Sequence, residues 1–410
     1  MSREFIVSVV IPTRNRAEYA FGAVKQVLSS GDADLQLVLQ DNSDDDSLSR
    51  MCAPYLADPR LTYNHCPEKL SFVDNFSEGV ALAEGEYVCL LGDDDGINPE
   101  LLEVARWASR SDVRAVKPGL QVLYLWPGAS LPGEADDGQL IVHTISQDVH
   151  QQNTDAELVK LVRRGGQDYL DLDLAKLYHG LVRRDALEQV KSVTGRYFGG
   201  LSPDIYAAVA LSTVIDKVVC LDYPLTISGI CRKSGSADSA TGRHTGKLSD
   251  APHFVGHESY EWSSDVPQFY SVETIWADSS LAAIREMNRP ELLAAFKPEA
   301  LAAYCLHRHP EFRGLIQDHY TGVQNARGVS RMRARSRLLR ARCEVPLRDL
   351  AVRVKRKLTG SARVVTRISG IPNVESAARE LTGLLKAEGL NVDHCLGKLD
   401  LPTRAGTEGQ

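Results

Sequence analysis

This sequence of 410 residues lacks several features that would place it in a familiar class. Its eight cysteines contain no CxxC pair and no other zinc-binding spacing, so they are expected to be reduced thiols of a cytosolic protein. No apolar stretch approaches the length that crosses a bilayer, and residues 1–4 lead into an apolar run without the pattern of a signal peptide. The net charge of -7 gives no reason to expect nucleic acid as a partner of the whole chain. These absences predict a cytoplasmic globular protein.

The most informative feature is a run of three aspartates, Asp93, Asp94 and Asp95, between the apolar residues 87–91 and Gly96. The apolar run predicts a short buried strand, which delivers the aspartates to the carboxyl edge of a sheet, where open α/β folds bind ligands. Neighbouring carboxylates repel one another unless a cation lies between them, and a divalent cation held in this way keeps positions open for phosphate oxygens. The cluster indicates a nucleotide diphosphate, with an ordinary Asp-rich turn as the alternative.

An alternation of strands and helices leads up to this cluster. Apolar, β-branched runs predict strands, and amphipathic stretches between them predict helices. The strands are expected at residues 5–11, 35–40, 61–64 and 87–91, and the helices at 19–30 and 71–84. Pro12 is expected to end the first strand, and no Gly-rich phosphate loop follows it. The order βαβαβαβ predicts a doubly wound, mostly parallel α/β sheet with charged loops along one edge.

Four blocks of this region resemble the successive motifs of family 2 glycosyltransferases. They are residues 9–16, 39–45, 75–76 and 85–95, and the similarity covers residues 5 to about 105 in order. The resemblance implies a GT-A fold, a mostly parallel sheet flanked by helices. It also implies an inverting glycosyltransferase with a nucleotide-diphosphate sugar as donor and Mn2+ or Mg2+ as cofactor, of the kind that builds bacterial-type polysaccharides, glycolipids or glycoconjugates. The acceptor would be a saccharide or a lipid-linked acceptor.

The resemblance also implies roles for individual residues. Pro12 and Arg14 would lie beside the nucleotide base. Asp41 would accept a hydrogen bond from the base, which favours UDP or TDP because a carboxylate can accept from a ring imide N–H; a turn or capping role is the alternative. Asp93 and Asp94 would lie near the ribose, and Asp95 would be the metal ligand.

The second half of such an enzyme must supply a general base for the acceptor hydroxyl. The candidate is Asp204, because Ser202 and Pro203 predict the start of a helix and place Asp204 in its first turn, near the positive end of the helix dipole. Acidic residues are also common there for stability alone. His179 is a possible acceptor contact, with a hydrogen-bonded core histidine as the alternative.

A Gly- and Ser-rich segment at residues 228–247 is expected to form a mobile loop, and long loops of this kind are often lids. Arg232, Arg243 and Lys247 would contact the donor diphosphate, and His244 would complete the metal shell. A plain solvated loop is the alternative.

The chain is longer than one typical domain, which predicts a catalytic unit at residues 1–250 and a mainly helical region at 251–410. Within the first, 1–110 would be the nucleotide-sugar half and 111–250 the acceptor half with the mobile loop. Residues 127–168 are polar and are interpreted as an insertion that shapes the acceptor cleft.

Residues 327–357 contain ten arginines and two lysines against Glu344 and Asp349. Apolar residues interleave with these charges, which predicts helices with a basic face for anionic lipid. Nucleic acid is a second possible partner of this face. The alternative is a solvated helix surface that binds no partner.

Two other functions remain open at this point. A nucleotidyltransferase uses a similar fold and metal, but that class usually begins with a Gly-rich phosphate loop. A non-catalytic sugar- or nucleotide-binding module would keep the fold without a general base.

Overall fold

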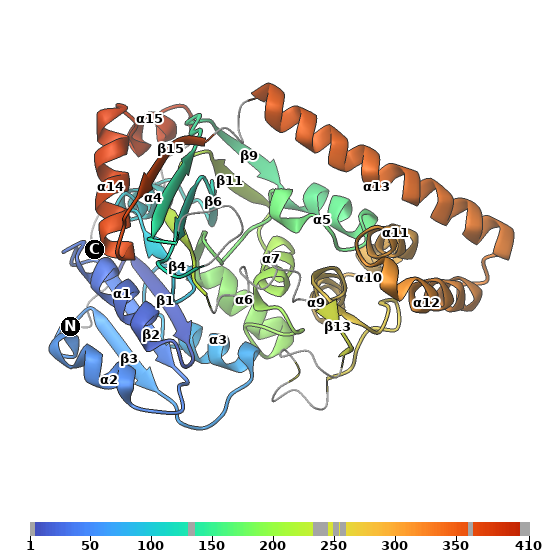
Figure 1. Cartoon of the computed structure of the whole chain (residues 1–410), viewed down its shortest axis with the longest axis horizontal. Helices are drawn as coiled ribbons and strands as arrows, with labels where there is room; N and C mark the ends of the chain where they lie inside the picture. The colour runs from blue at the N-terminus through green and yellow to red at the C-terminus, as the bar shows by residue number, and fades with distance from the viewer. Residues whose placement is uncertain are drawn as a thin grey trace, which may run out of the picture.

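The structure is a computed structural model that describes residues 5–129, 136–232, 245–248, 254, 260–359 and 364–401. In this part of the chain the main sheet has eight strands in the order β3-β2-β1-β4-β10-β6-β11-β9 (Figure 1). The strands are β1 (Val7–Thr13), β2 (Leu35–Asp41), β3 (Leu61–His65), β4 (Tyr87–Leu90), β6 (Ala115–Pro118), β9 (Val149–Asn153), β10 (Leu181–Arg183) and β11 (Lys217–Leu221). Strands β1 to β4 run parallel to one another, as do β6 and β11, whereas β10 and β9 are antiparallel to their neighbours. The predicted mostly parallel α/β sheet is confirmed.

The first strand runs two residues further than its sequence predicted. Its pairing with β4 ends at Val10, but its pairing with β2 continues to Thr13, opposite Asp41. Pro12 therefore lies where β1 has a strand on one side only, a position that tolerates a residue without an N–H.

Helices cover both faces of this sheet. Those before residue 213 are α1 (Ala17–Leu28), α2 (Ser47–Cys52), α3 (Phe72–Ala81), α4 (Leu101–Arg110), α5 (Thr154–Arg163), α6 (Arg184–Thr194) and α7 (Pro203–Ser212), with the 3-10 turns η1 (Ala53–Tyr55) and η2 (Tyr169–Asp171). Successive residues of β1 point to opposite faces. Val9 packs in a core with α1 and α4, and Val10 packs in a second core with α3, α6 and α7. Because both faces of β1 are buried, its sequence is continuously apolar rather than alternating.

The C-terminal region is mainly helical, as predicted. Its elements are α9 (Val272–Glu286), α10 (Pro290–Ala295), α11 (Pro298–Arg308), η5 (Pro310–Phe312), α12 (Arg313–Ala326), α13 (Arg331–Thr359), α14 (Val374–Ala387) and α15 (Val392–Leu396). Helix α13 is the long orange helix at the upper right of Figure 1, and it packs against α11 and α12. No helix in the described residues is both long enough and apolar enough to cross a membrane.

The last part of the chain returns to the N-terminal half. A second sheet has the order β15-β8-β7-β12-β5. Its strands are β5 (Gly96–Ile97), β7 (Val122–Leu125), β8 (Gln139–His143), β12 (Thr226–Ile230) and β15 (Val364–Ser369). Strands β13 (Thr245–Gly246) and β14 (Tyr270–Ser271) form a separate antiparallel pair. Strand β15 is antiparallel to β8, and α14 packs on α1 beside it (Figure 1). Residues 127–168 therefore do not form a separate insertion, because β8, β9 and α5 are built into the two sheets and their cover.

Candidate functional site

The candidate site lies where β1, β2 and β4 end, at one edge of the main sheet. Thr13 and Asp41 are paired at the ends of β1 and β2, and the three aspartates follow β4. The Thr13 hydroxyl donates to Asp93 Oδ2 at 2.5 Å, which ties the end of β1 to the acidic run. The expectation that the polar loops gather along one edge is confirmed for these three strands.

Asp93 and Asp94 turn toward a single cationic group. Arg16 Nη2 lies 3.0 Å from Asp93 Oδ1 and 3.0 Å from Asp94 Oδ2, and a second bond from Arg16 reaches Cys231 Sγ at 2.9 Å. Both carboxylates are buried. Burial raises the pKa of Asp93 to about 7 although Arg16 opposes the shift, and the pKa of Asp94 is raised for the same reason. Two buried carboxylates thus share one counter-charge.

Asp95 points away from Arg16, and both of its carboxylate oxygens accept hydrogen bonds from the protein. Its Oδ2 accepts hydrogen bonds from the Gly92 N–H at 2.7 Å and the Tyr178 hydroxyl at 2.9 Å, and its Oδ1 accepts from the Gly229 N–H at 2.7 Å. His179 Nε2 lies 3.3 Å from the same Oδ2. Burial raises the pKa of Asp95 to about 6, against these hydrogen bonds. The carboxylate therefore acts as an internal anchor of the acidic loop.

The backbone of the acidic loop is held equally closely. The Trp126 indole N–H donates to the Asp94 carbonyl at 2.8 Å. A Cβ on Gly229 would lie 1.8 Å from that carbonyl oxygen, so only glycine lets β12 approach at this point. The loop is consequently fixed on both sides before any ligand binds, which favours a preorganised site.

His179 lies beneath the cluster rather than in an open cleft. It is 5% exposed, and its Nδ1 lies 2.9 Å from the Thr226 hydroxyl. Burial lowers the pKa of His179 to about 4 against the charges of Asp94 and Asp204, so the ring is neutral at pH 7. This placement favours the core-histidine alternative over an acceptor contact.

The residues predicted to lie beside the nucleotide base occupy the ends of β1 and β2 and the loop that follows β1. Asp41 is buried, and it accepts from the Ser43 N–H at 2.9 Å and the Tyr63 hydroxyl at 2.8 Å. A carboxylate has about four acceptor positions, so these two bonds leave capacity for a ring N–H. Arg14 instead pairs with Asp44 at 3.1 Å on the more exposed side of the loop.

Asp204 lies in the first turn of α7, and Pro203 is the first helical residue, as the sequence predicted. Ser202 precedes the helix but does not cap it with its side chain, because its hydroxyl donates to Asp204 Oδ1 at 2.9 Å. The Tyr169 hydroxyl lies 3.2 Å from Asp204 Oδ2. Asp204 is half-buried and close enough for its charge to influence the pKa values of Tyr178 and His179, beside the acidic cluster.

The structure describes only some of the basic residues of the predicted lid. Arg232 and Lys247 are exposed, and neither pairs with the acidic run in the part of the chain that the structure describes. Arg243 and His244 lie outside the described residues.

Two contributors were not assigned from the sequence. Arg16 lies in the block 9–16 that resembles family 2 glycosyltransferases. Its position in a polar loop after a strand is the sequence feature that could have marked it as a site residue. Tyr178 stands directly before His179, but nothing local in the sequence predicts that its hydroxyl would reach Asp95, 83 residues away.

Residues 8–119 match the family model described as Glycosyl transferase family 2. This part of the chain is a family 2 glycosyltransferase domain. Its mostly parallel sheet, with acidic loops at one edge, has the GT-A fold that the resemblance implied.

Relatives of the glycosyltransferase domain match over similar segments. WcaA of Escherichia coli (strain K12), whose name describes a glycosyl transferase of colanic acid biosynthesis, is 30% identical over 105 residues, which cover 25% of this chain and 38% of that protein. Glycosyltransferase GlyG of Streptococcus pneumoniae serotype 4 is 24% identical over 99 residues, covering 24% and 33%. The match therefore spans well under half the length of these relatives.

Solved structures are similar over more of the chain but at low identity. S. aureus TarS 1-349 in complex with UDP-GlcNAc is 14% identical, with 79% of this chain and 93% of that chain covered and a TM-score of 0.44. Mannosyltransferase PcManGT from Pyrobaculum calidifontis, in complex with GDP-Man and Mn2+, is 13% identical, with 83% and 85% covered and a TM-score of 0.34. At these TM-scores the likeness has no bearing on the function.

The acidic run has the chemistry that a divalent cation requires. Hard cations prefer carboxylate oxygens, and Asp93 Oδ1 is a buried oxygen that, in the described part of the chain, is ion-paired with Arg16 but accepts no hydrogen bond. Arg16 places its positive charge between the two carboxylates that could hold the ion. The residues present therefore fit Mn2+ or Mg2+ in the glycosyltransferase domain.

Proposed function

We propose that this chain transfers a sugar from a nucleotide-diphosphate sugar to an acceptor hydroxyl, with inversion and with a divalent cation. The observation that carries the proposal is the buried pair Asp93 and Asp94, aimed at one positive charge at the ligand-binding edge of a family 2 domain. Buried carboxylates with raised pKa values in a fixed loop are typical of a functional site. Synthesis of a polysaccharide, glycolipid or related glycoconjugate is the setting that we propose.

Asp94, with Asp93, is the better candidate for the metal ligand than Asp95. The oxygens of Asp95 already receive two backbone N–H groups and one hydroxyl, and losing these bonds would leave buried donors unpaired. Among the described residues, Asp93 and Asp94 have Arg16 and one hydrogen bond each, from the Thr13 hydroxyl and the Cys231 N–H, to release. When bound, the cation would offset the charge of the departing diphosphate. Arg16 would then leave the carboxylates and become free to contact a phosphate oxygen.

The other residues have separate tasks. Asp41 would accept from the nucleotide base, with Pro12 and Arg14 beside it, which favours a uracil or thymine nucleotide. Asp204 would take the proton from the acceptor hydroxyl on the face opposite the departing diphosphate. The Tyr169 and Ser202 hydroxyls hold the Asp204 carboxylate in place for this step.

We further propose that α13 rests on an anionic membrane, at the cytoplasmic face. Its inner face packs on the protein through Ala334, Ala341 and Val345. On its opposite side runs an exposed apolar stripe, and arginines flank that stripe on both edges. The stripe is Met332, Leu339, Leu347, Leu350 and Val354. Apolar side chains between basic ones are typical of a helix that lies in the interface of an anionic bilayer.

Vesicle binding tests the membrane contact. We expect sedimentation with phosphatidylglycerol vesicles but not with phosphatidylcholine vesicles, and loss of sedimentation in Leu339→Gln/Leu350→Gln. Unchanged binding of that variant would show that the stripe does not contact lipid.

Calorimetric titration tests the donor site. UDP, TDP, GDP and CDP would each be titrated in Mn2+ and in EDTA against the native chain and Asp94→Asn, with Asp46→Asn as a matched control at an exposed position near the same edge. We expect metal-dependent binding of one diphosphate that is lost in Asp94→Asn and kept in the control. The proposal would be contradicted if none of the four diphosphates bound, or if the affinity were the same in EDTA as in Mn2+ and the same in Asp94→Asn as in the native chain.

A further inference from the structure

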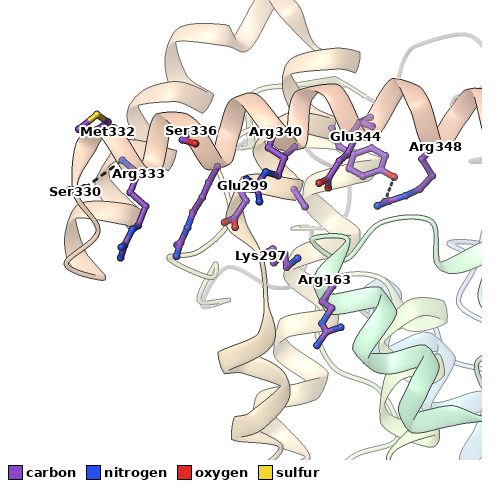
Figure 2. Close-up of a pocket in the computed structure, with 15 residues that line it drawn as sticks. Arg163, Lys297, Glu299, Ser330, Met332, Arg333, Ser336, Arg340, Glu344 and Arg348 are labelled. Carbon is purple, nitrogen blue, oxygen red and sulfur yellow. Dashed lines mark hydrogen bonds between the residues drawn. The ribbon is translucent and has the colours of Figure 1, made fainter.

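A groove lies far along the chain from the acidic cluster. It has a cavity volume of about 650 Å³ and is enclosed by the inner flank of α13, the start of α11 and the end of α5 (Figure 2). This volume falls within the roughly 300–1,000 Å³ of small-ligand sites. None of the residues assigned to sugar transfer lines the groove.

The groove is lined mainly by positive charge. Its cationic side chains are Arg163, Lys297, Arg333, Arg337, Arg340 and Arg348, against Glu299 and Glu344. In Figure 2, Arg333 and Arg340 extend from the underside of α13 toward the side that carries Lys297 and Arg163. The four arginines of α13 are spaced by four, three and eight positions, so they lie on one side of the helix.

Within the described ranges, most of these cations have no acidic partner. Arg348 is the exception: it lies 3.8 Å from Asp168 and donates to the Tyr304 hydroxyl at 3.1 Å, and Tyr304 donates to Asp168 at 2.5 Å. Among the described residues, the other five cations of the groove form no ion pair, although two glutamates share the space with them. Concentrating like charges in a concave surface is unfavourable unless an anion neutralises them.

We propose that this groove binds a ligand that carries two or more phosphate groups. Guanidinium groups bind phosphate oxygens in a bidentate manner, and several lie on one rigid helix that Tyr304 and Arg348 fix to α11. The positive, N-terminal end of α11, with Lys297 and Glu299, lines the same space and adds to the attraction. The source of the phosphates is either a soluble ester or a lipid headgroup.

Pyrophosphate is the probe for the test. It would be titrated into the full chain in EDTA and low salt, so that a metal-dependent donor site does not contribute. The groove variant is Arg337→Gln/Arg340→Gln, and the matched control is Arg331→Gln/Arg335→Gln, which removes the same charge from exposed positions of α13 that do not line the groove. We expect affinity to fall about tenfold or more in the groove variant and to remain within about twofold in the control.

Three outcomes would overturn the proposal. They are no pyrophosphate binding by the native chain, equal weakening in both arginine variants, and loss of binding in Asp93→Asn/Asp94→Asn. The Asp93→Asn/Asp94→Asn variant changes the donor site and leaves the groove intact, so it distinguishes pyrophosphate binding in the groove from binding at the donor site. Vesicles with phosphatidic acid identify the source: a lipid headgroup predicts weaker vesicle binding by the groove variant than by the control, and a soluble ester predicts equal binding by the two.

Discussion

Buried carboxylates in the two halves of the molecule have opposite environments. At the edge of the main sheet, Asp93 and Asp95 have pKa values raised to about 7 and about 6, because burial outweighs the groups that favour their charge. In the helical region, Glu273 is equally buried, but it contacts Arg308 at 2.8 Å and His309 at 2.7 Å. Burial alone would raise the pKa of Glu273, yet the His309 hydrogen bond and the charges of His309 and Arg308 outweigh it and lower the pKa to about 2.

The contrast separates a site from a structural contact. Glu273 has partners for both oxygens and joins α9 to the end of α11, so its charge stabilises the fold. Asp93 and Asp94 share one arginine and destabilise the fold while they remain charged. A protein retains such a pair where the carboxylates are needed for a ligand, here the divalent cation that we propose.

Asp204 is a third kind of carboxylate, half-buried and beside the cluster, and its replacement gives the largest expected effect. Asp204→Asn should lower sugar transfer by about 10²–10⁴-fold while donor binding is unchanged, because the variant removes only the general base that we propose. Turnover and calorimetric donor affinity would be measured together. Asp393→Asn in the first turn of α15 is the control for the helix-dipole contribution alone. Unchanged turnover of Asp204→Asn would remove the base assignment.

Glu273→Gln should cause the largest loss of stability. Removing one partner of a buried ion pair is expected to lower the free energy of unfolding by about 3 kcal/mol, near the lower end of the range because Arg308 is partly exposed. The contribution of native Glu273 should be complete above pH 4.5 and disappear as the pH falls toward 2, since its folded pKa is lowered. Urea unfolding across that interval tests both statements, and a similar acid dependence of the variant would contradict the second.

Asp95→Asn should be less damaging but still destabilising. In the native chain, buried donors face both carboxylate oxygens of Asp95. In the variant, an amide NH₂ group replaces one of these oxygens, which leaves a buried N–H or hydroxyl unpaired and lowers the free energy of unfolding by about 1–3 kcal/mol. Urea unfolding of this variant beside Asp94→Asn gives the comparison. If Asp94→Asn is the more destabilised of the two, the anchoring role belongs to Asp94 instead.

Asp93→Asn should have the smallest effect, and in the opposite direction. Because burial raises the folded pKa of Asp93 from 3.8 to about 7, the folded chain binds a proton that the unfolded chain releases. Its contribution to the free energy of unfolding therefore falls as the pH rises from about 4 to 7. Without metal at pH 8, the variant should be about 1 kcal/mol more stable than the native chain. Melting in EDTA at pH 5 and pH 8 measures the difference, and Asp46→Asn is the exposed control.

The strands that lead to the site could be predicted from the sequence. Doubly buried strands such as β1 and β2 are continuously apolar, and the polar residues that follow them mark the sheet edge. The direction in which each aspartate points was not predictable, because it depends on Tyr178, Gly229 and Arg16, which come from separate elements. The same limit applies to β8 and β15, which pair at Gln139 and Ser369, more than two hundred residues apart, with no local pattern in common.

The return of the chain's end to its beginning affects the order in which the protein matures. Ala377 and Leu381 of α14 pack in the same core as Ala20 and Ala23 of α1, and the Tyr124 hydroxyl donates to the Ile371 carbonyl. The ribosome makes α1 hundreds of residues before it makes α14. The part of the α1 surface that α14 covers therefore stays exposed until α14 has been made, and chaperones can bind it during that time.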